Sequence, residues 1–324
     1  MREIGSYLEL DLRNTGELFS GPNVCRLNTD RAGIYHCCRL LGVKKVCVPW
    51  YECFTVRDFL QKKGIKVCYY HIDRNFIPID PISDDETAIV FVNYFGLMCE
   101  KHIREIIKVH KNVIIDNAQA LFASPIMSCL NVYSARKFVG VPDGCYVVGK
   151  NVNRFVNEYA EDYSSATCDF LLKRHEVGCN AAYHDRMKNE ERIDNADIMR
   201  MSKLSHTILM NAPYRTIRNR RQKNLQYACK LYKDINLINP VQYADSTCVP
   251  FIFPLVVEDP ELVTKLANEK IFTGRWWHYL LSETSEDTFA HYLSKYMVPI
   301  PIDQRYGKEE LKYVHDKVVE LIKN

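Results

Sequence analysis

Two residues of opposite charge each stand at the end of a short apolar stretch. Asp116 closes the stretch Val-Ile-Ile-Asp, and Lys137 follows a second apolar stretch further along the chain. Burial makes an unpaired carboxylate costly, so Asp116 is expected to have a cationic or hydrogen-bonding partner. If the two stretches are neighbouring strands of a parallel sheet, their carboxyl ends open at the same edge. An acid and a lysine would then face one ligand.

Such a pair suits pyridoxal phosphate (PLP). A lysine can bond to the aldehyde carbon of this cofactor, and a carboxylate can keep the pyridine nitrogen protonated so that the ring accepts electrons. The phosphate needs a further set of donors. A helix that starts near residues 30–32 would present free backbone N–H groups, with Arg31 and the Ser134 hydroxyl as added donors.

Each of these features also has an ordinary structural explanation. An aspartate at the end of a strand is often a turn residue or a helix cap, and a single lysine is usually a solvated surface group. A segment such as Thr-Asp-Arg-Ala-Gly is more often a plain helix N-terminus than an anion site. Spacing alone therefore makes the combination suggestive but not specific.

Composition limits the class of protein. The chain has 324 residues, of which 47% are hydrophobic, and this is enough to build one large domain or two. The net charge of only +3 does not provide the concentrated basic surface that nucleic-acid binding requires. The N-terminus lacks the pattern of an export signal, and no apolar run reaches the length of a membrane span. We expect a soluble, cytoplasmic protein that binds neither nucleic acid nor membrane.

Thirteen cysteines are distributed mostly within apolar segments. No Cys-x-x-Cys pair and no paired histidine spacing accompanies them, which argues against a metal site. Disulfides are disfavoured in a reducing cytoplasm. The cysteines are expected to be buried, reduced thiols.

Helical and strand-like segments alternate in the first half of the chain. The expected helices cover 32–42, 55–64 and 101–110, and the expected strands cover 44–50, 66–73, 88–96 and 112–120. This alternation predicts an α/β fold, with a mostly parallel sheet covered by helices on both faces.

The second half changes character twice. Residues 151–195 form a polar, mixed-charge excursion, and a long connecting helix is expected within 201–235. After Pro240 the pattern of strand, helix, strand and helix predicts a small unit. We expect a large cofactor-binding domain over 1–239 and a small C-terminal α/β domain over 240–324.

Several segments resemble the DegT/StrS family of PLP-dependent sugar aminotransferases, a branch of the fold-type I aminotransferases. The resemblance runs from about Arg26 to Gly149, and "VCVPWYECFTVRDFLQKKGIKVCYYHID" is similar to the family's order of strand, proline, helix, glycine and strand. "IIDNAQA" resembles the family motif "EDAAQA". "YSARKF" followed by "PDG" resembles the family's serine-containing strand end, its cofactor-binding lysine and its return strand. The resemblance implies a fold-type I aminotransferase-like fold.

The resemblance also implies a role for each matched residue. Asp116 would pair with the pyridine nitrogen, and Gln119 would approach the ring hydroxyl. Ser134 would bind the phosphate. Lys137 would bond to the aldehyde carbon and act as general base and acid.

This sequence departs from the family pattern at three places. Ser134 and Lys137 are three residues apart rather than the usual five. The usual phosphate turn Ser-Gly-Thr is replaced by Thr-Asp-Arg, so Asp30 puts a carboxylate near a dianion, a repulsion that Arg31 would offset. The aromatic residue that commonly covers the cofactor ring aligns with Cys53. Either Cys53 covers the ring, or the neighbouring Tyr51 or Phe54 does.

The resemblance implies transfer of an amino group, from L-glutamate as the donor, to a nucleotide-linked keto-sugar in polysaccharide biosynthesis. It also implies a homodimer with shared active sites, to which residues 180–195 would contribute. Relatives that dehydrate deoxysugars carry histidine in place of the lysine, so Lys137 favours transamination. An alternative is a catalytically degenerate relative that binds a sugar nucleotide or a protein partner.

Overall fold

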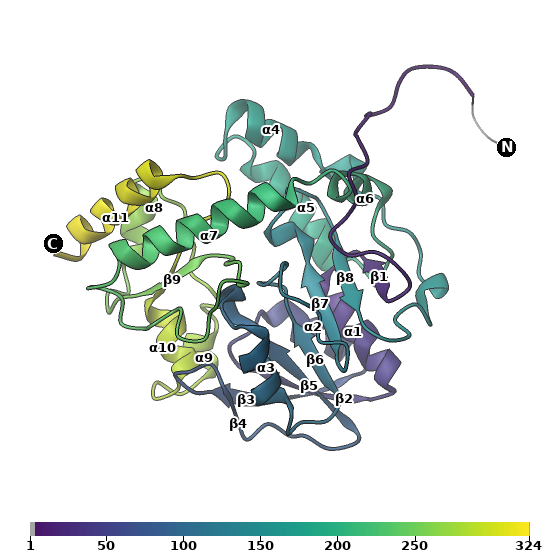
Figure 1. The fold of residues 1–324 in the computed structure, drawn as a ribbon, viewed down its shortest axis with the longest axis horizontal. Coiled ribbons are helices and arrows are strands. Elements are labelled where there is room, and N and C mark those ends of the chain that lie inside the picture. The colour runs from purple at the N-terminus through teal and green to yellow at the C-terminus, as the bar shows by residue number, and fades with distance from the viewer. Residues whose placement is uncertain (1–3, 324) are drawn as a thin grey trace.

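An eight-stranded sheet forms the centre of the larger part of the molecule (Figure 1). The computed structural model describes residues 4–323. In the order of the sheet the strands are β1 (Val24–Leu27), β8 (Cys145–Val148), β7 (Leu130–Ser134), β6 (Val113–Asp116), β5 (Thr87–Val92), β2 (Lys45–Pro49), β3 (Lys66–Ile72) and β4 (Pro78–Ile79). The five strands from β7 to β3 run parallel, whereas β8 and β4 are antiparallel to their neighbours. The predicted mostly parallel sheet is confirmed.

Helices of the same part follow the strands in the predicted alternation. They are α1 (Asp30–Leu41), α2 (Phe54–Lys62), α3 (Glu100–Ile107), α4 (Asp169–Val177), α5 (Tyr183–Asn195), α6 (Lys203–Leu209) and α7 (Tyr214–Leu231). Short 3₁₀ turns lie at η1 (Tyr94–Gly96), η2 (Ala135–Lys137), η3 (Val156–Glu158) and η4 (Ser165–Thr167). The single long helix expected within 201–235 is wrong: α6 and α7 are separate helices, because Pro213 has no amide hydrogen to continue α6 and instead precedes α7.

The C-terminal part contains the second sheet, an antiparallel pair of β9 (Phe253–Val256) and β10 (Met297–Ile300). Its helices are α8 (Leu262–Asn268), α9 (Leu280–Glu283), α10 (Phe289–Tyr296) and α11 (Lys308–Lys323). Helix α11 packs against both α7 and α8, so the long α7 joins the two parts (Figure 1). The predicted elements of this region are present, and the division at residue 240 stays a prediction.

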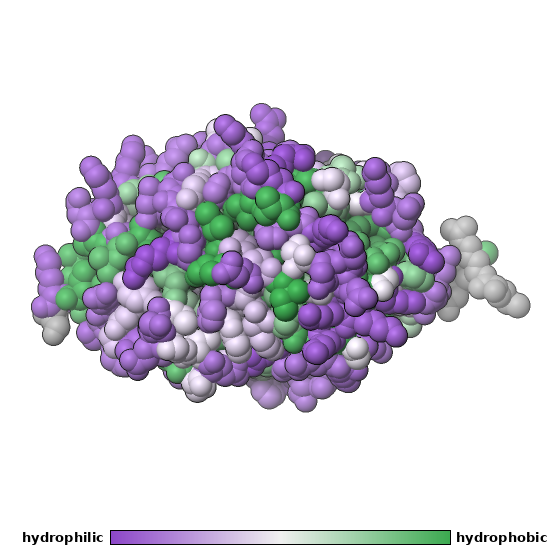
Figure 2. Space-filling model, turned by 90° about the horizontal axis from the view of Figure 1, so that it is seen from below, coloured by the Kyte–Doolittle hydropathy of each residue, from purple (hydrophilic) through white to green (hydrophobic). Residues whose placement is uncertain are grey.

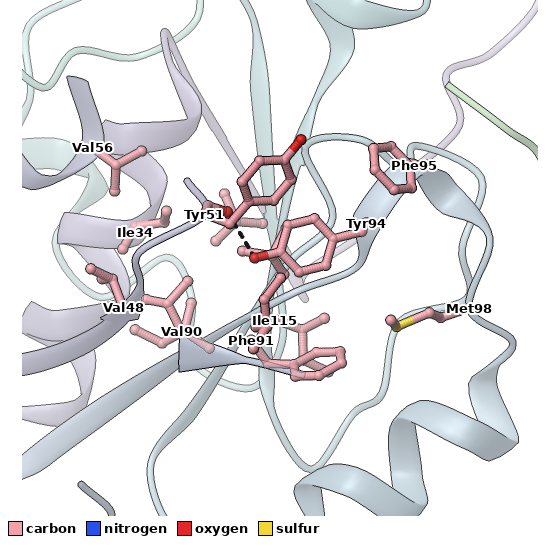
Figure 3. Packing of buried hydrophobic residues seen from close by; sticks show 14 of the residues in the cluster. Ile34, Val48, Tyr51, Val56, Val90, Phe91, Tyr94, Phe95, Met98 and Ile115 are labelled. Atoms are coloured by element: carbon pink, nitrogen blue, oxygen red, sulfur yellow. Dashed lines mark hydrogen bonds between the residues drawn. The ribbon is translucent and has the colours of Figure 1, made fainter. Parts of the chain in front are cut away.

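The strands in the middle of the sheet are apolar along their whole length because both of their faces are covered. Every residue of β5 and β6 is buried. Figure 3 shows how Val90 and Ile115 from the sheet pack with Ile34 of α1 and Val56 of α2. The face of the molecule in Figure 2 is mostly hydrophilic, with scattered hydrophobic areas.

No helix among residues 4–323 is both long and apolar enough to cross a membrane. Within the same residues, no group of three or more histidine, cysteine or acidic side chains is arranged to hold a metal ion. The thirteen cysteines are free thiols.

Candidate functional site

Asp116 and Lys137 lie at the same edge of the sheet. Asp116 is the last residue of β6, and Lys137 ends the 3₁₀ turn η2 that follows directly on β7, the parallel neighbour of β6. Asp116 is only 4% exposed, and its Oδ1 accepts a hydrogen bond of 2.7 Å from the Ala118 amide. Burial raises the pKa of Asp116, and the nearby Lys137 ammonium partly counteracts that rise. The topology therefore brings the acid and the lysine together.

The turn that carries Lys137 is held by the return strand. The Ala135 amide donates to the Gly144 carbonyl (3.0 Å), and Ser134 lies opposite Cys145 in the β7–β8 register. Gly144 has a φ of 129°, a conformation that side chains other than glycine rarely adopt. The Pro-Asp-Gly segment thus fixes the point at which β7 ends and the turn that carries Lys137 begins.

The N-terminus of α1 reaches the same edge. Thr29 caps it, with its Oγ1 accepting a 3.2 Å hydrogen bond from the Ala32 amide. The helix lies close against β7 and β8, because a Cβ at Gly33 would come within 2.8 Å of Val132 Cγ1 and 2.9 Å of Cys145 Sγ. The first amides of a helix have no carbonyl partner inside it, so this end of α1 is suited to an anion.

The two charged residues at the start of this helix act on different groups. Arg31 is buried, and its guanidinium donates to Asp194 Oδ1 at 2.9 Å and to the Ile193 carbonyl, both on α5. Asp30 instead acts on the site, since its charge raises the pKa of Asp116. The charge of Asp30 therefore acts on Asp116, whereas the guanidinium of Arg31 is bonded to α5.

Gln119 and Ser134 are both buried beside these groups. The Oε1 of Gln119 accepts a 2.8 Å hydrogen bond from the Phe95 amide, which leaves its amide nitrogen as the end of the side chain that can donate. Ser134 is the last residue of β7, immediately before η2. Each lies three residues from the acid or the lysine, and their expected contacts with the ring hydroxyl and the phosphate stay predictions.

Three neighbouring residues were predicted as alternatives for covering the cofactor ring. Tyr51 is completely buried and packs edge-on against Trp277, with ring centroids 4.4 Å apart. Phe54 is exposed and packs edge-on against Tyr279. Burial raises the pKa of the Cys53 thiol, and the charge of Lys137 partly counteracts that rise. Cys53 is thus the candidate on which the charge of Lys137 acts, and its Sγ lies 3.2 Å from Thr55 Oγ1.

Sequence reasoning missed Glu52. This residue is 6% exposed, and neither of its carboxyl oxygens has a hydrogen-bond partner among the residues that the structure describes. Burial raises its pKa, and the facing Asp116 and Asp30 carboxyls raise it further. The signal was a lone charge in the otherwise uncharged run Val-Pro-Trp-Tyr-Glu-Cys-Phe, next to the position expected to cover the ring.

Helix α5, which belongs to the segment predicted to serve a partner subunit, packs on its own chain. Besides holding Arg31, it pairs Glu190 with Arg136, the residue before Lys137. Its Asn189 donates to the Pro142 carbonyl at 2.9 Å. The polar excursion therefore packs against α1 and against the turn that carries Lys137.

A large hollow of about 1010 Å³ lies at the opposite edge of the sheet, lined in part by Asn112, Val113 and Leu130. These residues mark the amino ends of β6 and β7. Parallel sheets place their functional groups at the carboxyl ends of the strands, where the polar side chains of this protein gather. We therefore assign the candidate site to the carboxyl edge.

Comparison with known protein families and with curated proteins finds no match by sequence. Solved structures do match. The sugar aminotransferase CalS13 from Micromonospora echinospora has a TM-score of 0.65 at 16% identity, covering 91% of this chain and 86% of that one. The aminotransferase TlmJ from Streptoalloteichus hindustanus has a TM-score of 0.64 at 12% identity, covering 93% and 87%.

A third match has a cofactor in its structure. The GDP-4-keto-6-deoxy-D-mannose-3-dehydratase of E. coli, with bound hydrated PLP, has a TM-score of 0.62 at 16% identity, covering 91% of this chain and 87% of that one. Identities this low establish a shared fold. The chain has the fold of these proteins, which confirms the predicted fold-type I architecture.

Proposed function

We propose that this protein is a PLP-dependent aminotransferase, which moves an amino group from L-glutamate to a nucleotide-linked keto-sugar. The observation that carries the proposal is the placement of Asp116 and Lys137 at the carboxyl ends of two adjacent parallel strands. The fold shared with the sugar aminotransferase CalS13 and the aminotransferase TlmJ supports it. In this proposal the enzyme acts in the cytoplasm, in polysaccharide biosynthesis, and as a homodimer with shared active sites.

The residues present fit PLP well at the ring end and partly at the phosphate end. Asp116 is a buried carboxyl that needs a cation, and a protonated pyridine nitrogen is such a partner. The amides at the start of α1 and the Ser134 hydroxyl suit a phosphate. The Asp30 carboxylate opposes an anion there, and the guanidinium of Arg31 is bonded to α5.

When bound, PLP supplies an electron sink for the carbon that loses or gains the amino group. Lys137 would hold the cofactor through Nζ, and the same amine would take the proton from Cα of the amino donor and return a proton during transfer. Asp116 would keep a negative charge opposite the pyridine nitrogen. Gln119, fixed by the Phe95 amide, would orient the ring, and Cys53 would cover it.

A second candidate is a degenerate protein that binds a sugar nucleotide without chemistry. The observation that favours it is Asp30 at the phosphate end, because a carboxylate weakens the binding of an anion. Dehydration is less favoured, since the resemblance implies histidine at the lysine position in dehydrating relatives.

The test starts with purified full-length protein and added PLP. An aminotransferase should gain a visible absorption band that L-glutamate bleaches, and it should form amino-sugars from a panel of nucleotide-linked keto-sugars. Borohydride reduction followed by peptide mapping should attach the cofactor to Lys137. Protein that stays colourless with added PLP, yet binds a sugar nucleotide, would establish the degenerate alternative instead.

A further inference from the structure

The carboxyl group of Glu52 is the most unusual polar group of the site. It is almost completely buried, and no described residue donates a hydrogen bond to either oxygen. Buried carboxylates elsewhere in the chain do have donors. Asp143, for example, accepts hydrogen bonds from the Ser202 amide and hydroxyl at 3.1 and 2.9 Å. A buried carboxylate without donors is costly, and this cost favours the protonated, neutral form of Glu52.

Hydrogen bonds hold the backbone on both sides of the Glu52 side chain. The Glu52 amide donates to the Trp50 carbonyl at 2.9 Å, and the Tyr279 hydroxyl donates to the Glu52 carbonyl. The Tyr94 hydroxyl donates to the carbonyl of Tyr51 at 2.8 Å, as Figure 3 shows. These bonds fix the backbone from which the Glu52 side chain extends, and the Asp116 carboxyl acts on its carboxyl group.

The groups that face Glu52 come from several elements. Asp116 of β6, Asp30 of α1 and Lys137 of η2 act on it directly, and Cys53 and Cys145 lie within the same field. The tyrosine hydroxyls near it are occupied by backbone carbonyls: Tyr70 donates to Val90, Tyr94 to Tyr51 and Tyr279 to Glu52. The charges of three carboxyl groups and one ammonium group thus act on one another at this edge of the sheet.

We propose that Glu52 holds a proton that it shares with Asp116, and that this proton allows the site to accept an anionic, phosphorylated ligand. A protonated Glu52 carries its own donor, and the Asp116 carboxylate that faces it is an acceptor. Asp116 then keeps its charge for the pyridine nitrogen, while the site carries one negative charge fewer. The second half of this inference rests on the proposed function.

Electrostatics support this assignment of the proton. Burial raises the pKa of both carboxyls, and the field of Asp116 raises the pKa of Glu52 further. Two carboxyls in one desolvated site cannot both ionise cheaply, so they lose their protons as a coupled pair. Without the proton on Glu52, a phosphorylated ligand would enter a site with three carboxylates and Lys137 as the facing cation.

The first experiment concerns the cofactor-free protein. Infrared difference spectra between pH 5 and 9 should show a protonated carboxyl near neutral pH that Glu52→Gln removes. Asp116→Asn should keep the signal and move its midpoint to lower pH, because the field of the neighbouring carboxylate is gone. Glu283→Gln, which alters a surface pair with Arg57, should change neither. A signal that survives Glu52→Gln would overturn the shared proton.

The second experiment measures PLP dissociation constants by fluorescence at pH 6 to 9. In the wild-type protein the constant should rise with pH, by up to about tenfold per unit, because binding needs the proton. In Glu52→Gln it should stay nearly flat. Equal slopes in both proteins would refute the role of the proton in binding. If no variant binds PLP at any pH, the proposed function fails, while the infrared result still decides whether the proton is shared.

Discussion

Two largely buried glutamates of this protein have opposite surroundings. Glu17, in the N-terminal segment, accepts hydrogen bonds from Arg26 and from the Tyr146 hydroxyl, and His206 Nε2 lies 3.3 Å from its Oε2. Burial works against its ionisation, but the hydrogen bonds from His206 and Arg26 outweigh it and lower the pKa of Glu17 to about 2. Glu52 has no donor among the described residues and faces other carboxyls.

The two glutamates therefore differ in role: Glu17 stabilises the fold, whereas Glu52 belongs to the candidate site. Glu17 ties the N-terminal segment to β1, β8 and α6, so its ionised form stabilises the native state. The buried carboxyl of Glu52 lowers the free energy of unfolding. Destabilising groups of this kind are tolerated where function needs them. The comparison predicts that changes at the two places have opposite effects on stability and activity.

The largest effect is expected at Lys137, the cation that acts on the carboxyl groups of Glu52 and Asp116. Lys137→Ala should reduce amino transfer by at least about 10³-fold, because the residue that bonds the cofactor and moves the proton is lost. The free energy of unfolding should change by less than about 1 kcal/mol, since this side chain is partly exposed. Steady-state kinetics and urea unfolding measure the two quantities. Lys203→Ala, at an exposed lysine, is the control, and substantial activity in Lys137→Ala would reject the mechanism.

The next largest effect concerns Glu17. Glu17→Gln should lower the free energy of unfolding by about 2 kcal/mol, because hydrogen bonds to a charged group are lost from Arg26 and Tyr146. The activity of the folded protein should be unchanged. Urea unfolding at pH 7 measures the loss, with the exposed Glu9→Gln as the control. An unaltered unfolding midpoint would show that the Glu17 cluster contributes nothing to the fold.

A smaller effect, with opposite signs at the two glutamates, is expected from pH. The pKa of Glu17 is lowered on folding, so its stabilisation is present above the unfolded value and is lost as the pH falls toward about 2. The pKa of Glu52 is raised on folding. Its destabilising effect therefore appears above the pKa of the unfolded chain and grows as the pH rises.

Unfolding measured from pH 3 to 9 should separate these two contributions. Glu17→Gln should flatten the acid side of the stability curve. Glu52→Gln should flatten the alkaline side and stabilise the cofactor-free protein there by about 1 kcal/mol. If Glu52→Gln lowers stability throughout, the contrast between the two glutamates does not hold.

The smallest effect is expected at Asp30, on the phosphate side of the site. Asp30→Asn should tighten PLP binding about fivefold, a gain of about 1 kcal/mol, because a carboxylate near the phosphate is removed. Fluorescence titration at pH 8 measures this change. Asp58→Asn, at a mostly exposed residue of α2, provides the control. Weaker or equal binding in Asp30→Asn would mean that the phosphate does not lie at the start of α1.

Much of the fold followed from local patterns. The apolar runs of β2, β5 and β6 and the helices between them were predicted close to their observed positions, because a strand buried on both faces must be apolar throughout. The long connecting helix was predicted wrongly, since hydrophobic periodicity continued across Pro213 although the backbone could not. The placement of Lys137 at the same sheet edge as Asp116 was predicted from the parallel direction of their strands.

The surroundings of the site were not predictable in the same way. Arg31 was expected to offset the charge of Asp30, but its guanidinium bonds to Asp194, which is 163 residues away in the sequence. The importance of Glu52 was missed because its environment comes from α1, β6 and η2 together. Nothing within the run Tyr-Glu-Cys indicates that three carboxyls will converge.

The sequence by itself determined which residues end the strands, because the lengths of apolar runs and the turn residues after them are local properties. It therefore determined that an acid and a lysine share one edge of the sheet. Only the tertiary structure decided the charge that this edge carries. That charge depends on desolvation and on distances between side chains from separate elements, and these exist only once the helices have packed on the sheet.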